Sequence, residues 1–189
     1  LGEHPYGYSP FYYDLSPFLN PTGTDNVLAV KVDHTRYADS RWYTGSGIYR
    51  NVKLITVSKL HIPVWGEFVT TPEVSETSAT VNMRVRVANQ FDSEQHFDLV
   101  TEFISPEGKT VLTLKSENQK MNSGENEFEF QGVIEKPALW GTEKPMLYQA
   151  KTSIVQHGKT VDQSTTRFGI RSIRFDAETG FFLNGKNMK

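Results

Sequence analysis

Residues 39–54 read DSRWYTGSGIYRNVKL, and the character of this stretch changes halfway along it. The first half combines an acid, a guanidinium and two aromatic rings, which is typical of sugar-facing surfaces because ring faces stack and charged groups bind hydroxyls. In the second half, Gly45 and Gly47 give the backbone the freedom for a tight turn. The apolar positions in residues 48–54 then predict a strand that enters a core. On residue types alone, a plain loop that closes onto a β-sandwich is the favoured explanation of the stretch.

Further along the chain, residues 80–87 alternate strictly between apolar and polar side chains. One face carries Val81, Met83, Val85 and Val87, and the other carries Asn82, Arg84 and Arg86. This period of two predicts a half-buried antiparallel strand. A second strand is predicted at residues 97–103, whereas residues 70–73, with Pro72, predict a turn.

Shorter segments complete this region. Residues 111–114 and 125–134 predict two more strands, and residues 146–155 and 160–168 predict a hairpin around the turn at 157–159. No segment has a helical period. Six or seven short strands at regular spacing indicate an immunoglobulin-like sandwich, so the fold class is all-β.

The N-terminal residues are dense in glycine, proline and aromatic side chains. Pro5, Pro10 and Pro17 exclude a long helix in residues 1–19, and a short turn is predicted at residues 14–19. Residues 27–32 alternate and predict a strand.

Composition narrows the classes of function. The chain has 189 residues, 20 basic and 22 acidic side chains and a net charge of -2, and its charges are interspersed, so no nucleic-acid partner is expected. With no cysteine there is no disulfide and no thiolate site. No apolar run approaches the roughly 18 residues of a membrane span. Because the chain begins with Leu1 rather than Met, we expect it to be a piece of a longer protein.

Two clusters of ionisable residues could suggest chemistry. His4, Asp33, His34 and Asp39 lack the spacing that provides two metal ligands from one element, so no metal or other cofactor is predicted. Glu125, Glu127 and Glu129 share one strand face. Three like charges in a row are typical of a solvated outer face or a guard against aggregation rather than of an acid and base pair. No catalytic residue is predicted in this chain.

Several motifs together resemble one family. The string SRWYTGSGIYRNVKL resembles the end of the N-terminal sugar-binding jelly roll of glycoside hydrolase family 2, which includes β-galactosidases, β-glucuronidases and β-mannosidases. GEHPYGYSPFYYDLSPFL and DNVLAVKVDH resemble the middle of that jelly roll. PALWGTEKPMLY is similar to the signature of the family's immunoglobulin-like second domain, and FGIRSIRF with GFFLNGK resembles its bridge into a catalytic (β/α)8 barrel.

The resemblance implies a division into three parts. Residues 1–59 would be the C-terminal part of the jelly roll, residues 60–168 the immunoglobulin-like sandwich, and residues 169–189 the linker and first hairpin of the barrel. The barrel, with its two catalytic glutamates, lies outside this chain. The parent would be a retaining β-glycosidase, most simply a β-galactosidase, in which this part supports and orients the barrel. Its partners would be a carbohydrate and the barrel of the same parent chain.

The resemblance also implies a substrate-binding site at Arg41, Asp39 and Trp42. Arg41 stands six positions before Gly47, where β-galactosidase and β-glucuronidase relatives carry an Asp that reaches into the sugar pocket. Other relatives have a Ser-Arg-Trp-Tyr version, in which Arg41 would donate to hydroxyls or to a carboxylate. An Arg41 stacked on Trp42 or Tyr43 within the loop is the equal alternative.

A second class of function stays open. A stand-alone carbohydrate-binding or adhesion module made of two β-sandwiches would use Trp42 and Tyr43 as its stacking platform. The sequence leaves undecided the sugar, its linkage, whether the protein forms a homo-oligomer, and whether it lies in the bacterial periplasm or cytoplasm.

Overall fold

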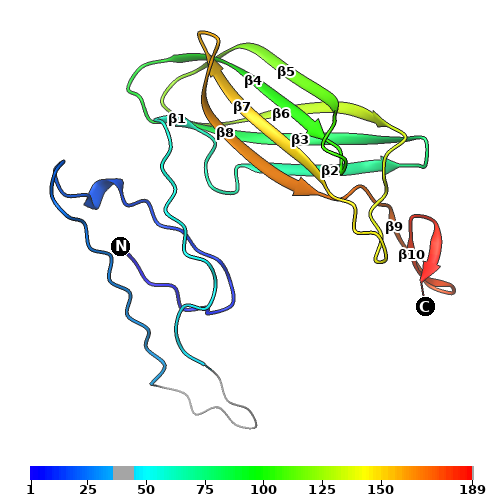
Figure 1. Cartoon of the computed structure of the whole chain (residues 1–189), viewed down its shortest axis with the longest axis horizontal. Helices are drawn as coiled ribbons and strands as arrows, with labels where there is room; N and C mark the ends of the chain where they lie inside the picture. The colour runs from blue at the N-terminus through cyan, green and yellow to red at the C-terminus, as the bar shows by residue number, and fades with distance from the viewer. Residues whose placement is uncertain (36–44, 189) are drawn as a thin grey trace. The chain divides into compact units, whose positions relative to one another are not determined.

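The computed structural model describes residues 1–35 and 45–188. It divides into two compact units, Leu1–Ile55 and Thr56–Lys189 (Figure 1). The strands of the described residues all lie in the second unit, and all pair antiparallel. The all-β fold class predicted from the sequence is confirmed.

The first unit consists of extended chain and turns in its described part. Its one helical element there is the 3-10 turn η1, Ser16–Phe18, so the described residues contain no helix long enough to cross a membrane. Pro17 lies within η1, and the Ser16 N–H donates to Asp14 Oδ1 at 2.8 Å. The turn predicted at residues 14–19 is confirmed.

The strands predicted at residues 27–32 and 48–54 are both wrong for this structure. Neither segment pairs with a strand among the described residues, and Val27 and Leu54 are 90% and 82% exposed. Alternation predicts which side chains would face a core, but a strand also needs a neighbouring backbone to accept and donate its hydrogen bonds.

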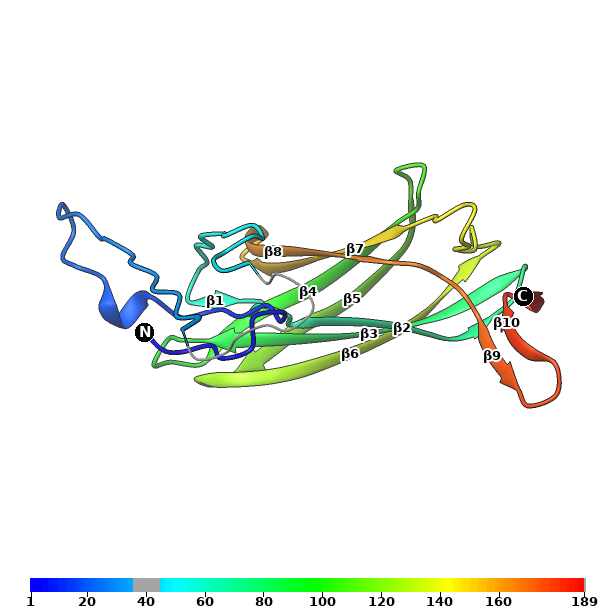
Figure 2. The same ribbon diagram turned by 90° about the horizontal axis from the view of Figure 1, so that it is seen from below.

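The second unit is a sandwich of two sheets. Its strands are β1 (Leu60–His61), β2 (Glu67–Val74), β3 (Ser78–Asn89), β4 (Gln95–Ile104), β5 (Thr110–Met121), β6 (Gly124–Glu135), β7 (Tyr148–Gln156) and β8 (Lys159–Phe168). In one sheet β3 is central and pairs with β1, β2 and β6; the other sheet has the order β5-β4-β7-β8. Figure 2 shows β2, β3 and β6 in one layer and β7 and β8 in the other.

The core lies between these sheets. Val81, Met83, Val85 and Val87 of β3 have no exposed surface, and the same holds for Leu99 and Phe103 of β4. The alternation predicted for both strands is therefore confirmed. Each fully buried aliphatic or aromatic side chain contributes about 1.5–3 kcal/mol of transfer free energy, so this layer is the main source of stability of the unit.

Side chains also join the sheets at their edges. Glu67 Oε2 of β2 accepts hydrogen bonds from Ser164 Oγ (2.8 Å) and Thr166 Oγ1 (2.7 Å) of β8. The Ile62 N–H donates to Asp162 Oδ2 at 2.7 Å. β8 is thus linked by polar contacts to the sheet that contains β2.

The turn predicted at residues 70–73 is instead part of β2. The register against β3 shifts between Thr70 and Glu73, so Pro72 lies in a bulge on a strand at the sheet edge. Proline has no N–H to donate, and such a bulge is where a strand tolerates it. Pro72 therefore did indicate an irregularity of the backbone, but one within a strand rather than a turn between strands.

The hairpin predicted around residues 157–159 is confirmed. β7 and β8 pair from Tyr148↔Phe168 to Gln156↔Lys159. His157 and Gly158 both have positive φ, 51° and 74°. Two successive residues in this region form the tight turn whose twist matches that of antiparallel strands.

The segment with Trp140 connects the sandwich to the C-terminal strands. The Trp140 N–H donates to Ile170 O (2.8 Å), and Asn184 Nδ2 donates to Trp140 O (2.9 Å). The Trp140 ring is half-buried, with the Arg171 guanidinium 4.6 Å from its centroid. The three short C-terminal strands form a separate small sheet: β9 (Ile173–Asp176), β10 (Gly180–Leu183) and β11 (Lys186–Met188).

Candidate functional site

The three side chains predicted to contact sugar, Arg41, Asp39 and Trp42, lie outside the described residues. The residues on either side of this segment meet, because Ser46 Oγ and His34 Nδ1 are 3.0 Å apart. The chain therefore enters and leaves residues 36–44 at neighbouring points within the first unit.

Asp33 forms a local turn next to this point. Thr35 donates to Asp33 Oδ1 through its hydroxyl (2.6 Å) and its N–H (3.1 Å). These hydrogen bonds, that of the hydroxyl first, hold the pKa of the Asp33 carboxyl below its ordinary value. Across residues 1–35 and 45–188 there is no group of three or more His, Asp or Glu side chains that could hold a metal ion.

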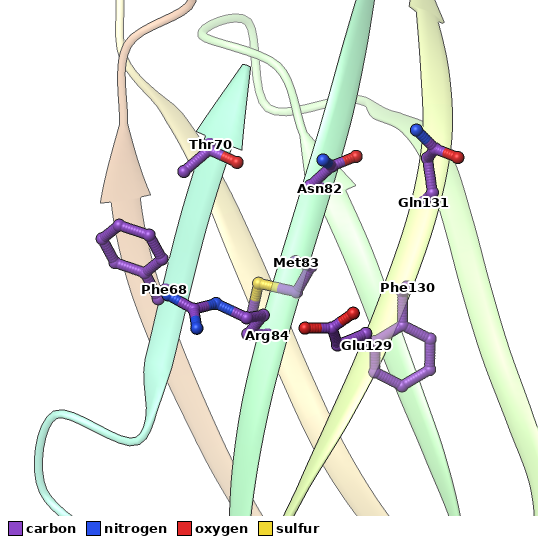
Figure 3. A pocket seen from close by; sticks show the side chains of 8 residues that line it. All are labelled: Phe68, Thr70, Asn82, Met83, Arg84, Glu129, Phe130 and Gln131. Atoms are coloured by element: carbon purple, nitrogen blue, oxygen red, sulfur yellow. The ribbon is translucent and has the colours of Figure 1, made fainter. Parts of the chain in front are cut away.

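A second polar site lies on the outer face of the sheet formed by β2, β3 and β6. Its side chains form an open groove of about 490 Å³, here called the outer groove, which Figure 3 shows from close by. The polar and exposed residues that line it are Phe68, Thr70, Asn82, Arg84, Glu129 and Gln131.

The outer groove does not have the composition of a glycosidase active site. A retaining glycosidase uses two carboxyl groups about 5–5.5 Å apart. Glu129 provides the one carboxylate in the lining of this groove. The groove can offer hydrogen bonds and an aromatic ring, but not the acid and nucleophile of that reaction.

The neighbouring glutamates lie on a solvated face, as predicted. Glu127 pairs with Arg84 at 3.5 Å and Glu125 pairs with Arg86 at 3.6 Å, with all four side chains 42–55% exposed. Ion pairs this exposed contribute at most about 1 kcal/mol each. The sequence missed that the arginines of β3 neutralise the two glutamates, because the β3–β6 register cannot be seen in a single segment.

The sequence also missed how the outer groove is assembled. Asn82 and Arg84 were recognisable as the polar face of a strand, but Phe68 belongs to a strand that was not predicted. Gln131 faces Asn82 only because β6 returns beside β3. The available signal was the alternation in residues 125–134. It predicts which side chains share one face of the strand, but not which strand lies beside it.

Comparison with known proteins identifies the family. The model for glycosyl hydrolases family 2 matches residues 61–171. The chain belongs to glycosyl hydrolases family 2. This assignment confirms the resemblance drawn from the motifs, and the match covers the sandwich of the second unit, from the end of β1 to beyond β8.

Relatives of the family 2 chain match it along its whole length. It is 38% identical over 189 residues to the β-galactosidase BoGH2A of Bacteroides ovatus, covering 100% of the chain and 22% of that relative. A putative β-glucuronidase of Formosa agariphila is 34% identical, with 100% of the chain and 17% of the relative covered. The chain thus spans about a fifth of the length of these relatives.

Solved structures agree with the fold. The crystal structure of a β-glycosidase from Bacteroides vulgatus has a TM-score of 0.82 and 30% identity to this chain. The match covers 100% of this chain and 23% of the Bacteroides vulgatus chain. The Bacteroides uniformis β-glucuronidase 2 covalently bound to cyclophellitol-6-carboxylate aziridine has a TM-score of 0.66 and 33% identity, over 70% and 17% of the two chains.

Proposed function

We propose that this chain is the non-catalytic, all-β part of a longer retaining β-glycosidase that hydrolyses β-galactosides. The observation that carries the proposal is the 38% identity to β-galactosidase BoGH2A over all 189 residues. In this proposal, residues 1–59 complete a sugar-binding jelly roll, residues 60–168 form the immunoglobulin-like domain and residues 169–189 lead into the barrel. The division between Ile55 and Thr56 supports a boundary near residue 59.

The role of this part is to support the barrel and to contribute side chains from residues 36–44 to the sugar site. The hydrogen bond between His34 and Ser46 supports the second role, because it holds together the described residues on either side of this stretch. Arg41, Asp39 and Trp42 are the residues we propose for contact with substrate.

A β-glucuronide is the second candidate substrate. The 34% identical relative from Formosa agariphila is a putative β-glucuronidase, and the solved Bacteroides uniformis relative is a β-glucuronidase bound to a carboxylated ligand. A galactoside and a glucuronide differ in the configuration of the C4 hydroxyl and at C6, where the glucuronide carries a carboxylate in place of a hydroxymethyl group. A guanidinium such as that of Arg41 binds a carboxylate in a bidentate manner, so this residue would serve either substrate.

Reading the gene beyond Lys189 and assaying the full-length product tests the proposal. We expect a barrel-coding continuation and hydrolysis of nitrophenyl β-galactoside faster than that of the β-glucuronide. The reverse preference would select the second candidate. A stop codon directly after Lys189 would overturn both and favour the stand-alone carbohydrate-binding module.

The 189-residue chain itself provides a control in this assay. Because its outer groove offers one carboxylate, Glu129, and the barrel is absent, purified chain should hydrolyse neither nitrophenyl glycoside. Hydrolysis that persists through purification and scales with chain concentration would contradict the assignment of catalysis to the barrel.

A further inference from the structure

The outer groove is organised in two rows across three strands. The strand register places Phe68, Arg84 and Glu129 in one row and Thr70, Asn82 and Gln131 in the next. Their side chains lie on the outer face because the alternate residues of β3 fill the core. Figure 3 shows the Arg84 side chain between Phe68 and Glu129, and the three side chains of the other row beyond it.

The first row combines a ring with two charges. Phe68 is 53% exposed, and the Arg84 guanidinium lies 4.8 Å from its ring centroid. Arg84 forms its ion pair with Glu127, diagonally across the strands, rather than with Glu129 directly opposite. Within the described part of the chain, Glu129 takes part in none of the ion pairs or side-chain hydrogen bonds. Its carboxylate therefore remains an acceptor for a ligand.

The second row contains an unsatisfied group. Asn82 Oδ1 is buried and has no hydrogen-bond partner within the described residues. A buried acceptor without a partner destabilises the folded state, because it has given up its hydrogen bonds to water. Rotation of the Asn82 side chain toward the groove would bring this oxygen within reach of a ligand hydroxyl, and a donated hydrogen bond would then satisfy it. Thr70 and Gln131 flank Asn82 in the same row and supply further donors and acceptors.

These features fit a neutral saccharide. A sugar ring offers an apolar C–H face to an aromatic ring and adjacent hydroxyls that both donate and accept, which suits amides, a carboxylate and a guanidinium together. One acid and one base in the lining do not create the basic field that a polyanion needs. The groove volume of about 490 Å³ lies within the usual range for small-molecule sites.

We propose that the outer groove of the immunoglobulin-like sandwich is a non-catalytic binding site for a neutral oligosaccharide, held through Phe68, Asn82 and Glu129. The choice of a saccharide rests on the carbohydrate substrate class of the proposed function, whereas the site itself rests on the geometry of the second unit. Such a site would keep the protein on a glycan while another site acts on it.

The test titrates the 189-residue chain with three neutral β-linked tetrasaccharides, of galactose, mannose and glucose, and follows backbone amide chemical shifts by NMR. We expect at least one tetrasaccharide to bind with a Kd of about 1 mM or tighter. The shifts should be confined to β2, β3 and β6. Affinity should be the same at about 0.05 and 0.5 M NaCl, because screening does not act on an uncharged ligand.

Variants then test whether the tetrasaccharide binds in the outer groove. Phe68→Ala and Asn82→Ala should each weaken binding roughly tenfold, and the exposed, isosteric Glu129→Gln, for which no loss of folding is expected, should weaken it about fivefold. Matched controls are Phe175→Ala, whose ring is 79% exposed on β9, and Asn122→Ala in the turn before β6. Both controls should bind like the unchanged chain.

Any one of the following results would overturn the inference. They are no shift changes with any tetrasaccharide at about 10 mM, shifts that lie outside the outer groove, and equal affinity of Glu129→Gln and the unchanged chain. Line broadening of groove amides that disappears on dilution would identify a second copy of the chain as the occupant and would also overturn it. Saccharide binding without any glycosidase activity of the full-length protein would reject the proposed function but leave this site standing.

Discussion

Gly169 lies directly against Trp140. A Cβ at position 169 would come within 2.9 Å of both Cβ and Cγ of Trp140. The indole cannot move away easily, because the Trp140 backbone is bonded to Ile170 and Asn184. We therefore expect Gly169→Ala to lower the free energy of unfolding by about 1–3 kcal/mol, measured by urea denaturation.

Gly141→Ala is the matched control for this change. A Cβ at position 141 meets nothing within 4 Å, and Gly141 has no positive φ. Gly141→Ala therefore only reduces the conformational entropy of the unfolded chain. This should raise the free energy of unfolding by about 0.4–1 kcal/mol. Equal urea midpoints for the two variants would show that the contact with Trp140 imposes no constraint.

The proposed role of Arg41 leads to a kinetic prediction for the full-length enzyme. If Arg41 donates to the substrate, Arg41→Ala should lower kcat/KM about tenfold to a hundredfold, because a lost hydrogen bond to a charged group costs about 1.5–3 kcal/mol. The thermal midpoint should stay almost unchanged. Kinetic constants and Tm are measured on the same preparation.

Lys53→Ala serves as the control for Arg41→Ala. Lys53 is an exposed cation of the same unit and was not predicted to contact sugar, so its loss should change neither quantity. A fall in Tm of several degrees with intact kinetics in Arg41→Ala would instead support an arginine stacked on Trp42 or Tyr43.

At the scale of elements, alternation predicted the strands whose inner faces are mainly apolar. β3 and β4 were recognised for this reason, and the tight turn at His157 and Gly158 fixed the β7–β8 hairpin. β5 was predicted as residues 111–114 but extends over Thr110–Met121. Residues 115–120 of this strand, Lys-Ser-Glu-Asn-Gln-Lys, include no apolar side chain, and they are held as a strand by pairing with β4.

Pairing between strands distant in sequence also explains what could not be predicted of the candidate sites. The outer groove depends on β6 lying beside β3, and neither segment alone indicates its neighbour. The candidate site at Arg41 was predicted from the motif, and that prediction stands on resemblance, since the segment lies outside the described residues. The register of a strand and the identity of its neighbouring strand are set only in the assembled sheet, so a single segment of sequence does not reveal them.

The turn between β9 and β10 leads to a prediction about pH. The Thr179 hydroxyl (2.6 Å) and N–H (2.8 Å) donate to Asp176 Oδ1, and together with the Glu178 N–H and Arg174 they lower the pKa of Asp176 to about 2. An unfolded Asp has a pKa of about 3.9. The depressed value means that ionised Asp176 stabilises the turn fully above pH ~4, and that this contribution is lost as the pH falls from about 4 to about 2.

The chemical shift of the Thr179 amide measures this directly. It should titrate with a midpoint near 2, and the transition should disappear in Asp176→Asn. A midpoint close to 4 would mean that the hydrogen bonds to the carboxylate do not persist in solution.

For the whole molecule, the two units should differ in resistance to proteolysis. The described residues of the first unit form no strand ladder and leave large apolar side chains such as Val27 and Leu54 more than 80% exposed. Proteases cleave backbone that is free of pairing. We therefore expect the first cuts within residues 1–55 and a resistant product beginning near Thr56, identified by mass spectrometry.

This experiment requires a sample that is monomeric by light scattering, because a second chain could cover the exposed edge. Equal resistance of both units in such a sample would contradict the division at Ile55 and Thr56.

The pairing of β3 with β6 also constrains the route by which the chain folds. The ladder runs from Asn89↔Gly124 to Ser78↔Glu135, so its first rung closes over residues 90–123, which contain β4 and β5 in the opposite sheet. A β-hairpin forms locally in about 1–10 μs, and once β4 and β5 pair, the two ends of this segment are brought together. Most of the conformational entropy that is lost when β3 and β6 come together has then already been lost before the central ladder forms. We therefore expect the β4–β5 hairpin to form before the β3–β6 ladder, although no residue of β4 or β5 lines the outer groove.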